Sequence, residues 1–116
     1  MNNDLRLEIV QMVKRSRDGH IPSSFSIVDI IDYIYGNELN YNINNLSWED
    51  RDYFILSKGH GCMALYVVLR KYGILSDSDI ENYGTVDGIL GGHPDSTRIP
   101  GVEASTGSLG HGFPTA

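Results

Sequence analysis

The sequence is poor in the features that define several classes of protein. Its single cysteine, Cys62, excludes an internal disulfide and is typical of a reducing compartment. Nine Lys and Arg stand against 15 Asp and Glu, a net charge of −6, so the chain lacks the basic face with which nucleic-acid binders hold phosphates. No apolar run is long enough to cross a bilayer, and the N-terminus has no apolar signal core. We therefore expect a cytoplasmic protein without nucleic-acid or membrane partners.

What the sequence does have is a regular association of glycine with histidine. Chance would place a glycine before all four histidines with a probability on the order of two in ten thousand. Glycine lets the backbone turn sharply and approach a ligand, and histidine offers a hydrogen-bonding ring that titrates near neutral pH. The pattern predicts one polar site assembled from several loops, with at least one pair serving only as a turn. The pairs are Gly19-His20, Gly59-His60, Gly92-His93 and Gly110-His111.

Apolar residues at three- and four-residue spacing predict four helices, over 4–17, 27–35, 62–72 and 77–82. Ser26 with Asp29 resembles a capping box for the second helix, and Ser76 is expected to cap the fourth. Gly36 and Gly73 are expected to end the second and third helices. Residues 19–24 and the polar stretch 37–52 are expected to be loops, and the apolar run 53–56 a buried strand.

A glycine-rich segment follows the last of these helices. Residues 84–112 contain eight glycines together with Pro94 and Pro100, which favours a set of functional loops. Their end, 107–112, is predicted to lead into a new helix at 113–116. The order of elements predicts the opening of an α/β domain with a parallel sheet flanked by helices. One strand cannot form such a sheet, so we expect residues 1–116 to be the N-terminal part of an incomplete domain.

Three loops are candidates for chemistry, each with a plainer alternative. The segment 107–112 could cradle an anion or cofactor at a helix start, although its spacing matches neither the P-loop nor the dinucleotide fingerprint, and turns of this kind are common. His60 is predicted at the carboxyl end of a strand, where α/β sheets bind ligands, or is simply a capping residue. His93 stands between the flexible Gly92 and the rigid Pro94. This placement suits a residue that contacts a substrate hydroxyl, and the plainer alternative is a simple β-turn. The histidine spacings give no local zinc pattern, and Cys62 is expected to be a buried helix residue.

Taken in order, four segments resemble the transketolase family, at the start of its thiamine-diphosphate-binding N-terminal domain. The first resembles the family's Ser-Gly-His-Pro-Gly loop, and the second its Trp-x-x-Arg-Asp-x-Phe-x-Leu-Ser-x-Gly-His motif. The third resembles Gly-His-Pro-Glu, and the fourth Gly-Val-Glu-x-Thr-Thr-Gly-x-Leu-Gly-Gln-Gly. These segments are Arg17-Asp18-Gly19-His20, Trp48 to His60, Gly92-His93-Pro94-Asp95 and Gly101 to Gly112.

The resemblance implies a reaction and a set of roles. The reaction is the thiamine-diphosphate-dependent transfer of a two-carbon ketol unit from a ketose phosphate to an aldose phosphate, in carbohydrate metabolism and the pentose phosphate pathway. His20 would contact the substrate near the reacting carbons and assist proton transfer, and His93 would bind the donor sugar's first hydroxyl. These two are the implied catalytic and substrate-binding residues. The implied cofactor contacts are His60 and the backbone of Gly107, Ser108 and Leu109.

The chain also departs from the family. Ile21-Pro22-Ser23 follows His20 where the family has Pro-Gly, and His111 stands at a position where Gln is usual. The family's Gly-Asp-Gly motif and later Asn, which bind Mg²⁺, do not occur before Ala116, and neither does the domain that supplies the activating Glu. The complete enzyme would bind thiamine diphosphate, Mg²⁺ and sugar phosphates, as a homodimer or with a C-terminal subunit.

We therefore expect a truncated product or fragment that is inactive alone and does not bind the cofactor tightly. Two alternatives remain open. One is an interaction module that pairs with a complete or C-terminal transketolase subunit. The other is a small metal protein with a histidine site.

Overall fold

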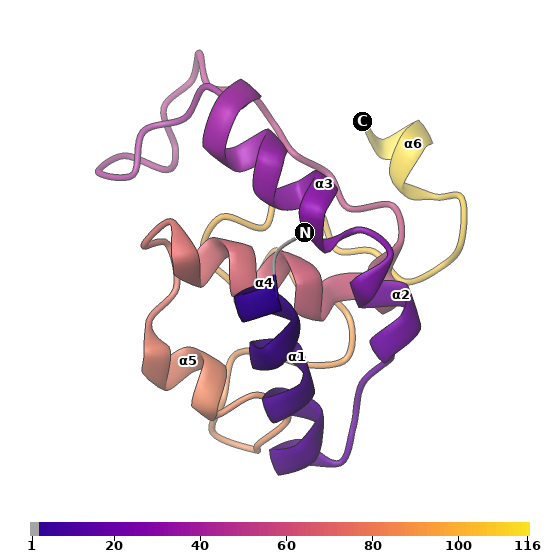
Figure 1. The fold of residues 1–116 in the computed structure, drawn as a ribbon. Helices are drawn as coiled ribbons and strands as arrows, with labels where there is room; N and C mark the ends of the chain where they lie inside the picture. Colours follow the sequence, from indigo (N-terminus) through magenta and orange to yellow (C-terminus); the bar gives the residue numbers. More distant parts are fainter. Residues whose placement is uncertain (1–2) are drawn as a thin grey trace.

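A computed structural model describes residues 3–116 as short helices arranged around one central helix, α4 (Figure 1). The N-terminal helices α1 and α3 and the later helix α5 lie around α4, and the C-terminal turn of helix, α6, stands apart at one side (Figure 1). The elements in order are α1 (Asn3–Ser16), α2 (Ile21–Phe25), α3 (Val28–Tyr33), the π-helical turn η1 (Ile34–Glu38), the 3₁₀ turn η2 (Gly59–Gly61), α4 (Cys62–Lys71), α5 (Asp77–Glu81) and α6 (Gly112–Thr115). Within this described range, no helix is long and apolar enough to cross a membrane.

Helix α4 is buried because it is apolar on every face. Its first eight residues, Cys62 to Leu69, are all buried, as expected for a helix with no polar stripe. Helix α1 contributes Leu5, Ile9 and Met12 from a single face, at the three- and four-residue spacing that predicted this helix. The expectation that Cys62 is a buried helix residue is confirmed, since its exposed fraction is 1%.

Two of the predicted helix ends are confirmed in detail. The Ser76 hydroxyl accepts from the Asp79 N–H at 3.1 Å, and the Asp79 carboxylate accepts from the Ser76 N–H at 3.0 Å, so a full capping box begins α5. Helix α4 ends at Lys71, and Gly73 follows with a φ of +84°, the left-handed conformation that glycine tolerates.

The predicted strand at 53–56 is wrong, and residues 3–116 contain no strand at all, so the parallel sheet expected of an α/β fold is not seen. A strand exists only where a neighbouring extended segment completes its hydrogen-bond ladder. Here the Leu56 carbonyl accepts a hydrogen bond from the Thr106 hydroxyl at 2.6 Å. Leu56 is buried, whereas Tyr53 at the other end of the run is 57% exposed.

The predicted loop at 19–24 is partly wrong, because α2 occupies Ile21–Phe25, with Pro22 in its first turn. The capping box at Ser26 is also wrong. Helix α3 begins after Ile27 without a side-chain cap, and Asp29 pairs instead with Arg6 at 2.8 Å. Lys58 donates to the Ser26 hydroxyl at 2.8 Å, so Ser26 joins α2 to the loop before α4.

The helix predicted over 27–35 does not stop at Gly36, because the π-helical turn η1 carries it on to Glu38. Gly36 instead makes room for the Tyr72 hydroxyl, which a Cβ at this position would strike. The Tyr72 hydroxyl in turn donates to the Asp32 carboxylate at 3.0 Å. This glycine therefore serves packing between η1 and the end of α4, which a sequence pattern of helix stops does not reveal.

Arg17, the residue directly after α1, has a backbone conformation that costs free energy. Its φ is +56°, the left-handed region that disfavours side chains other than glycine, and its N–H donates to the Val13 carbonyl at 2.7 Å. Replacing Arg17 by Gly should therefore relieve local strain and raise the free energy of unfolding by up to about 1 kcal/mol. Urea unfolding measures the change. Arg15→Gly, inside α1, is the matched control and should lower stability by about 1 kcal/mol. A destabilised Arg17→Gly variant would contradict this account of the helix end.

Candidate functional site

Two of the glycine-histidine loops meet at the N-terminal end of α4. His60 lies in η2, one turn before the helix, and its ring packs edge-on against the ring of His93 with centroids 5.0 Å apart. These residues are 33 positions apart in sequence and reach each other through the glycine-rich segment. The fold thus brings together two of the histidines that the sequence analysis selected.

His20 borders the same cleft as His60 and His93. This cleft has a volume of about 390 Å³, and we call it the histidine cleft. Its walls come from the loop after α1, from η2 and the start of α4, and from the glycine-rich segment. All three histidines predicted to act on substrate or cofactor therefore border one space. The residues that line it are Asp18, Gly19, His20, His60, Cys62, Met63, Tyr83, Gly92 and His93.

A second space lies on the other side of His93. This loop cleft has a volume of about 560 Å³ and is lined by His93, Ser105, Thr106, Gly107, Ser108 and His111. Gly107 and Ser108, predicted to contact the cofactor, line it. Leu109, predicted with them, does not, and its side chain is 73% exposed. His111, for which the sequence offered the weakest argument, faces this cleft together with His93.

His93 is held from behind by α4. The Tyr66 hydroxyl donates one proton shared between the carbonyls of Gly91, at 2.9 Å, and His93, at 3.2 Å. The Cys62 thiol donates to the Gly92 carbonyl at 3.1 Å. Burial raises the pKa of the Cys62 thiol to about 11, so it stays protonated and remains a donor near neutral pH. The central helix thereby fixes the backbone on which His93 is mounted.

His20 is oriented by the helix that follows it. It is the N-terminal cap of α2, and its Nδ1 accepts a hydrogen bond from the Ser23 N–H at 3.2 Å. Because Nδ1 is an acceptor here, a neutral ring carries its proton on Nε2. Nε2 is therefore the nitrogen left to donate to a ligand in the histidine cleft.

Glycines are required where the two site loops touch. A Cβ at Gly59 would lie 2.7 Å from the Gly107 nitrogen, and a Cβ at Gly107 would lie 2.8 Å from Cδ2 of the His93 ring. The loop before α4, the 105–108 loop and His93 thus form a stack with no space for added atoms. The glycine of the Gly59-His60 pair allows this close approach.

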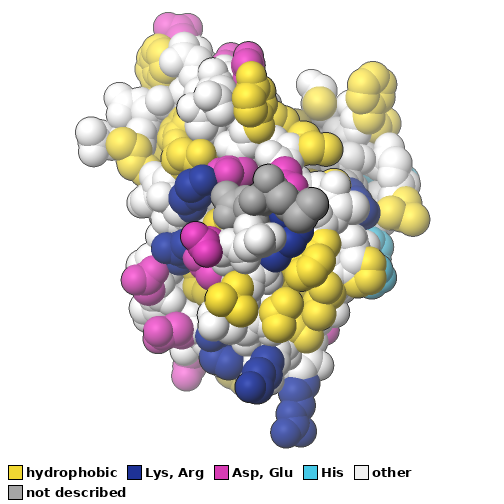
Figure 2. Space-filling view, viewed as in Figure 1, with side chains coloured by type: hydrophobic (Ala, Val, Ile, Leu, Met, Phe, Trp, Pro, Cys, Tyr) yellow, Lys and Arg dark blue, Asp and Glu magenta, His cyan; other side chains and the backbone are white. Residues whose placement is uncertain are grey.

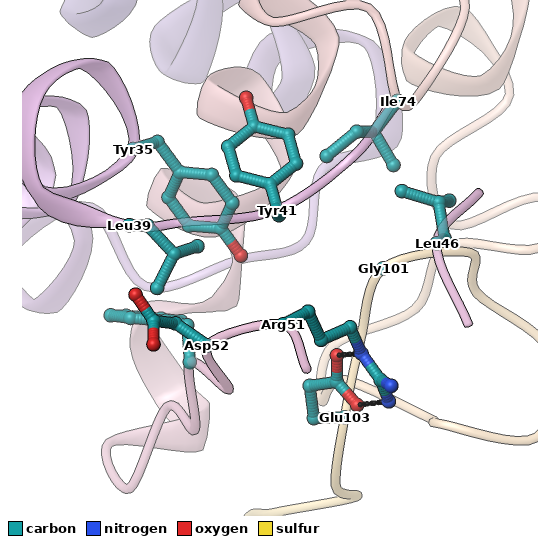
Figure 3. Close-up of a pocket in the computed structure, with 10 residues that line it drawn as sticks. Tyr35, Leu39, Tyr41, Leu46, Arg51, Asp52, Ile74, Gly101 and Glu103 are labelled. Atoms are coloured by element: carbon teal, nitrogen blue, oxygen red, sulfur yellow. Dashed lines mark hydrogen bonds and ion pairs between the residues drawn. The ribbon is translucent and has the colours of Figure 1, made fainter. Parts of the chain in front are cut away.

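An ion pair anchors the far end of the 101–108 segment. Arg51 donates two parallel hydrogen bonds to Glu103, at 3.0 Å and 2.9 Å, and both side chains are largely buried (Figure 3). The guanidinium also lies 4.1 Å from the ring centroid of Tyr53 and donates to the Trp48 carbonyl. Two-pronged pairing of this kind fixes orientation as well as distance. The polar loop around residues 48–52 is thereby fastened to the segment that leads into the loop cleft.

The donors of the loop cleft fit a diphosphate better than a metal ion. The backbone N–H groups of Gly107 and Ser108 have no hydrogen-bond partner within the described range, and the Ser108 hydroxyl lies on the same loop. Hydroxyl, imidazole and free N–H groups suit phosphate oxygens. Among residues 3–116, no group of three or more His, Cys, Asp or Glu side chains is placed to hold a metal ion.

Sequence reasoning missed three residues of this site. Tyr66 supports His93, and Asp18 and Tyr83 line the histidine cleft. Asp18 directly precedes a Gly-His pair, which was the available signal. Tyr66 gave none, because an aromatic residue in an apolar stretch looks like core until its hydroxyl is placed. Tyr83, between Asn82 and Gly84, gave none either, because nothing in that short segment indicates that its side chain reaches a cleft.

Comparisons with known proteins identify the family of this chain. The family model for the thiamine diphosphate binding domain of transketolase matches residues 1–116. "Transketolase 1" of Vibrio cholerae is 36% identical over 115 residues, 98% of this chain and 17% of that protein. "Transketolase 1" of Aliivibrio fischeri is 38% identical over 112 residues, 96% of this chain and 17% of that protein.

Solved structures agree as well. A transketolase variant from Pichia stipitis superposes with a TM-score of 0.83 at 32% identity, covering 94% of this chain and 16% of the other. Transketolase from Leishmania mexicana gives a TM-score of 0.82 at 30% identity, with the same coverage of 94% and 16%. The chain belongs to the family of transketolase thiamine diphosphate binding domains, and it spans about a sixth of the length of these relatives.

The contact between Gly59 and Gly107 can be tested by adding one methyl group. Gly59→Ala should lower the free energy of unfolding by about 1–3 kcal/mol, because the new Cβ meets backbone atoms that have no room to move. Gly91→Ala is the matched control, since a Cβ there meets nothing within 4 Å, and it should change stability by less than about 0.5 kcal/mol. Thermal unfolding of both variants gives the comparison. Equal stability of the two would show that the two loops are not in contact.

Proposed function

We propose that this chain forms one wall of the active site of a thiamine-diphosphate-dependent transketolase, an enzyme that moves a two-carbon ketol unit from a ketose phosphate to an aldose phosphate. The observation that carries the proposal is that His20, His60 and His93 border a single cleft, with the glycine-rich cofactor loop on the other side of His93. Membership of the family supplies the reaction class.

We propose that one cleft binds the cofactor and the other binds the sugar. We assign the loop cleft to the cofactor, whose diphosphate would be held by the N–H groups of Gly107 and Ser108, with His60 approaching it from the histidine cleft, beside His93. When bound, thiamine diphosphate supplies the carbon nucleophile that accepts the ketol unit. His93 lies between the two clefts, so one ring can contact both a sugar and the cofactor side.

His20 and His93 act on the sugar. His20, with Nδ1 occupied by Ser23, holds or moves a proton at Nε2 near the reacting carbons. His93 binds the donor's first hydroxyl, and the hydrogen bonds from Tyr66 and Cys62 to its loop keep the ring in place. Fixed donors and acceptors of this kind lower the cost of orienting a substrate.

The rest of the active site lies outside these 116 residues. A related transketolase from Pichia stipitis has been solved with sedoheptulose-7-phosphate, which supports sugar phosphates as the substrate class. Mg²⁺ ligands, and a second copy or a C-terminal subunit, would complete the site. We therefore propose that the isolated chain binds the cofactor weakly and does not catalyse ketol transfer.

A non-catalytic role as an interaction module is the second candidate, and α6 favours it. Phe113 is 87% exposed, and the neighbouring Leu109 is also exposed. Apolar side chains exposed to water on a short helix and in the loop just before it are typical of a surface that a partner covers. A complete or C-terminal transketolase subunit is the proposed partner.

A titration tests the cofactor wall. Thiamine diphosphate with Mg²⁺, added to the ¹⁵N-labelled chain, should shift the amide signals of residues 107–109 and of His60, with weak affinity. His60→Ala should weaken binding by about tenfold, because it removes a hydrogen bond to a charged group. Glu49→Gln, an exposed change outside both clefts, is the control. Micromolar affinity or any ketol transfer by the chain alone contradicts the one-wall proposal, and shifts away from these loops contradict the assignment of the cofactor.

The interaction module makes a different prediction. Mixed with the C-terminal part of a transketolase, the chain should sediment as a complex, and Phe113→Ser should weaken that complex by about tenfold or more, since it removes a large exposed aromatic anchor. Val86→Ser, at an even more exposed apolar residue elsewhere, is the control. If the chain sediments as a monomer in the presence of the partner, this role is contradicted.

A further inference from the structure

The histidine cleft contains two polar side chains that the roles above do not use. Asp18 and Tyr83 both line it, and neither matches a residue to which the sequence analysis assigned a function. The Asp18 carboxylate is placed opposite the His93 loop, since a Cβ added at Gly92 would lie 3.9 Å from its Oδ2. No hydrogen bond or ion pair engages this carboxylate within the described residues.

The backbone of Asp18 is nevertheless fixed. The Ser16 hydroxyl accepts from the Asp18 N–H at 3.2 Å, and its one proton is shared between the carbonyls of Met12, at 2.7 Å, and Asp18, at 3.0 Å. The left-handed Arg17 on one side and Gly19, with a φ of +129°, on the other turn the chain sharply at this point. The carboxylate is thus held at the mouth of His20's loop by local structure that does not involve its own oxygens.

Tyr83 shows a polar group without a partner. Its side chain is only 3% exposed, yet its hydroxyl has no hydrogen-bond partner. Buried hydroxyls nearly always find a partner, so an unsatisfied one in the wall of a cleft marks a place for an incoming acceptor. Burial raises the pKa of Tyr83, and the neighbouring Cys62 and Asp18 raise it further, so the hydroxyl keeps its proton and can donate.

The charge of the cleft restricts what can bind beside them. Its nine lining residues include one carboxylate and no Lys or Arg. Figure 2 shows Lys and Arg side chains over the C-terminal end of α1, the end that leads into Asp18. None of these side chains lines the cleft, so a phosphate inside it would meet the like charge of Asp18 without a Lys or Arg in the lining. A sugar hydroxyl both donates and accepts, so it can donate to Asp18 and accept from Tyr83.

We propose that Asp18 and Tyr83 form a hydroxyl-binding subsite that selects the uncharged, hydroxyl-bearing part of a sugar and disfavours phosphate at this position. The inference rests on the proposed function, in which the sugar enters the histidine cleft. It adds the orientation of that sugar: its phosphate end must point away from Asp18, toward residues outside this cleft.

The probes are D-fructose and D-fructose 6-phosphate, titrated into the ¹⁵N-labelled chain while the amide signals of residues 18–20 and 91–93 are followed. Asp18→Asn keeps the shape and removes the charge. It should weaken fructose binding by about fivefold and leave fructose 6-phosphate unchanged or tighter, so the ratio of the two affinities changes by at least fivefold. Asp87→Asn, an exposed carboxylate outside both clefts, should leave the ratio unchanged.

Tyr83→Phe separates binding from structure. It should weaken fructose binding by about threefold while leaving the melting temperature equal or higher, because the hydroxyl it removes has no partner in the fold. A lower melting temperature would mean a structural role for the hydroxyl and would overturn the proposal, as would an unchanged affinity ratio in Asp18→Asn.

His93→Ala distinguishes the two levels of inference. If it weakens fructose binding while the Asp18 and Tyr83 variants do not, the sugar cleft stands and the subsite fails. If fructose shifts no signal in these loops, or His93→Ala has no effect, the proposed function of the cleft fails and the subsite with it.

Discussion

The burial of α4 is the constraint on which the rest of the molecule depends. A helix that is apolar all round is stable only when other elements cover every face, and each large apolar side chain buried this way contributes about 1.5–3 kcal/mol. Helices α1, α3 and α5 provide that cover. The same helix starts directly after His60 and holds the His93 loop through Cys62 and Tyr66, so core and candidate site share one element. Damage to its packing would therefore reach both histidines.

How far the sequence predicted this structure depends on the range of the interactions involved. Elements set by local rules were predicted well: the apolar faces of α1 and α4, and the capping box at Ser76. The strand at 53–56 failed because a strand depends on a partner elsewhere in the chain. Ser26 and Gly36 failed because distant side chains, Lys58 and Tyr72, use them for other contacts. Local pattern cannot distinguish a cap or a stop from a residue recruited by tertiary packing.

The candidate site shows the same division. Glycine before histidine indicated loops that approach closely, and three of the four histidines border one cleft, with His111 on the next. The Gly59–Gly107 contact explains why a small residue is needed there, which spacing alone could not show. Tyr66, Asp18 and Tyr83 became visible only when their hydroxyl and carboxylate oxygens were placed in space. The unusual Gly-His pairs therefore predict which loops form the site. The supporting and lining residues that complete it can be identified only from the structure.

The central claim is that this chain assembles the histidine and loop clefts by itself, with His93 between them. Nuclear Overhauser effects in the isolated chain test it most directly. The account predicts cross-peaks between the His60 and His93 rings, and between the His93 ring and the Gly107 α-protons, which should also be shifted by the ring current. Sharp histidine signals at random-coil positions, without these cross-peaks, would show that the loops come together only when more of the enzyme is present and would contradict the account.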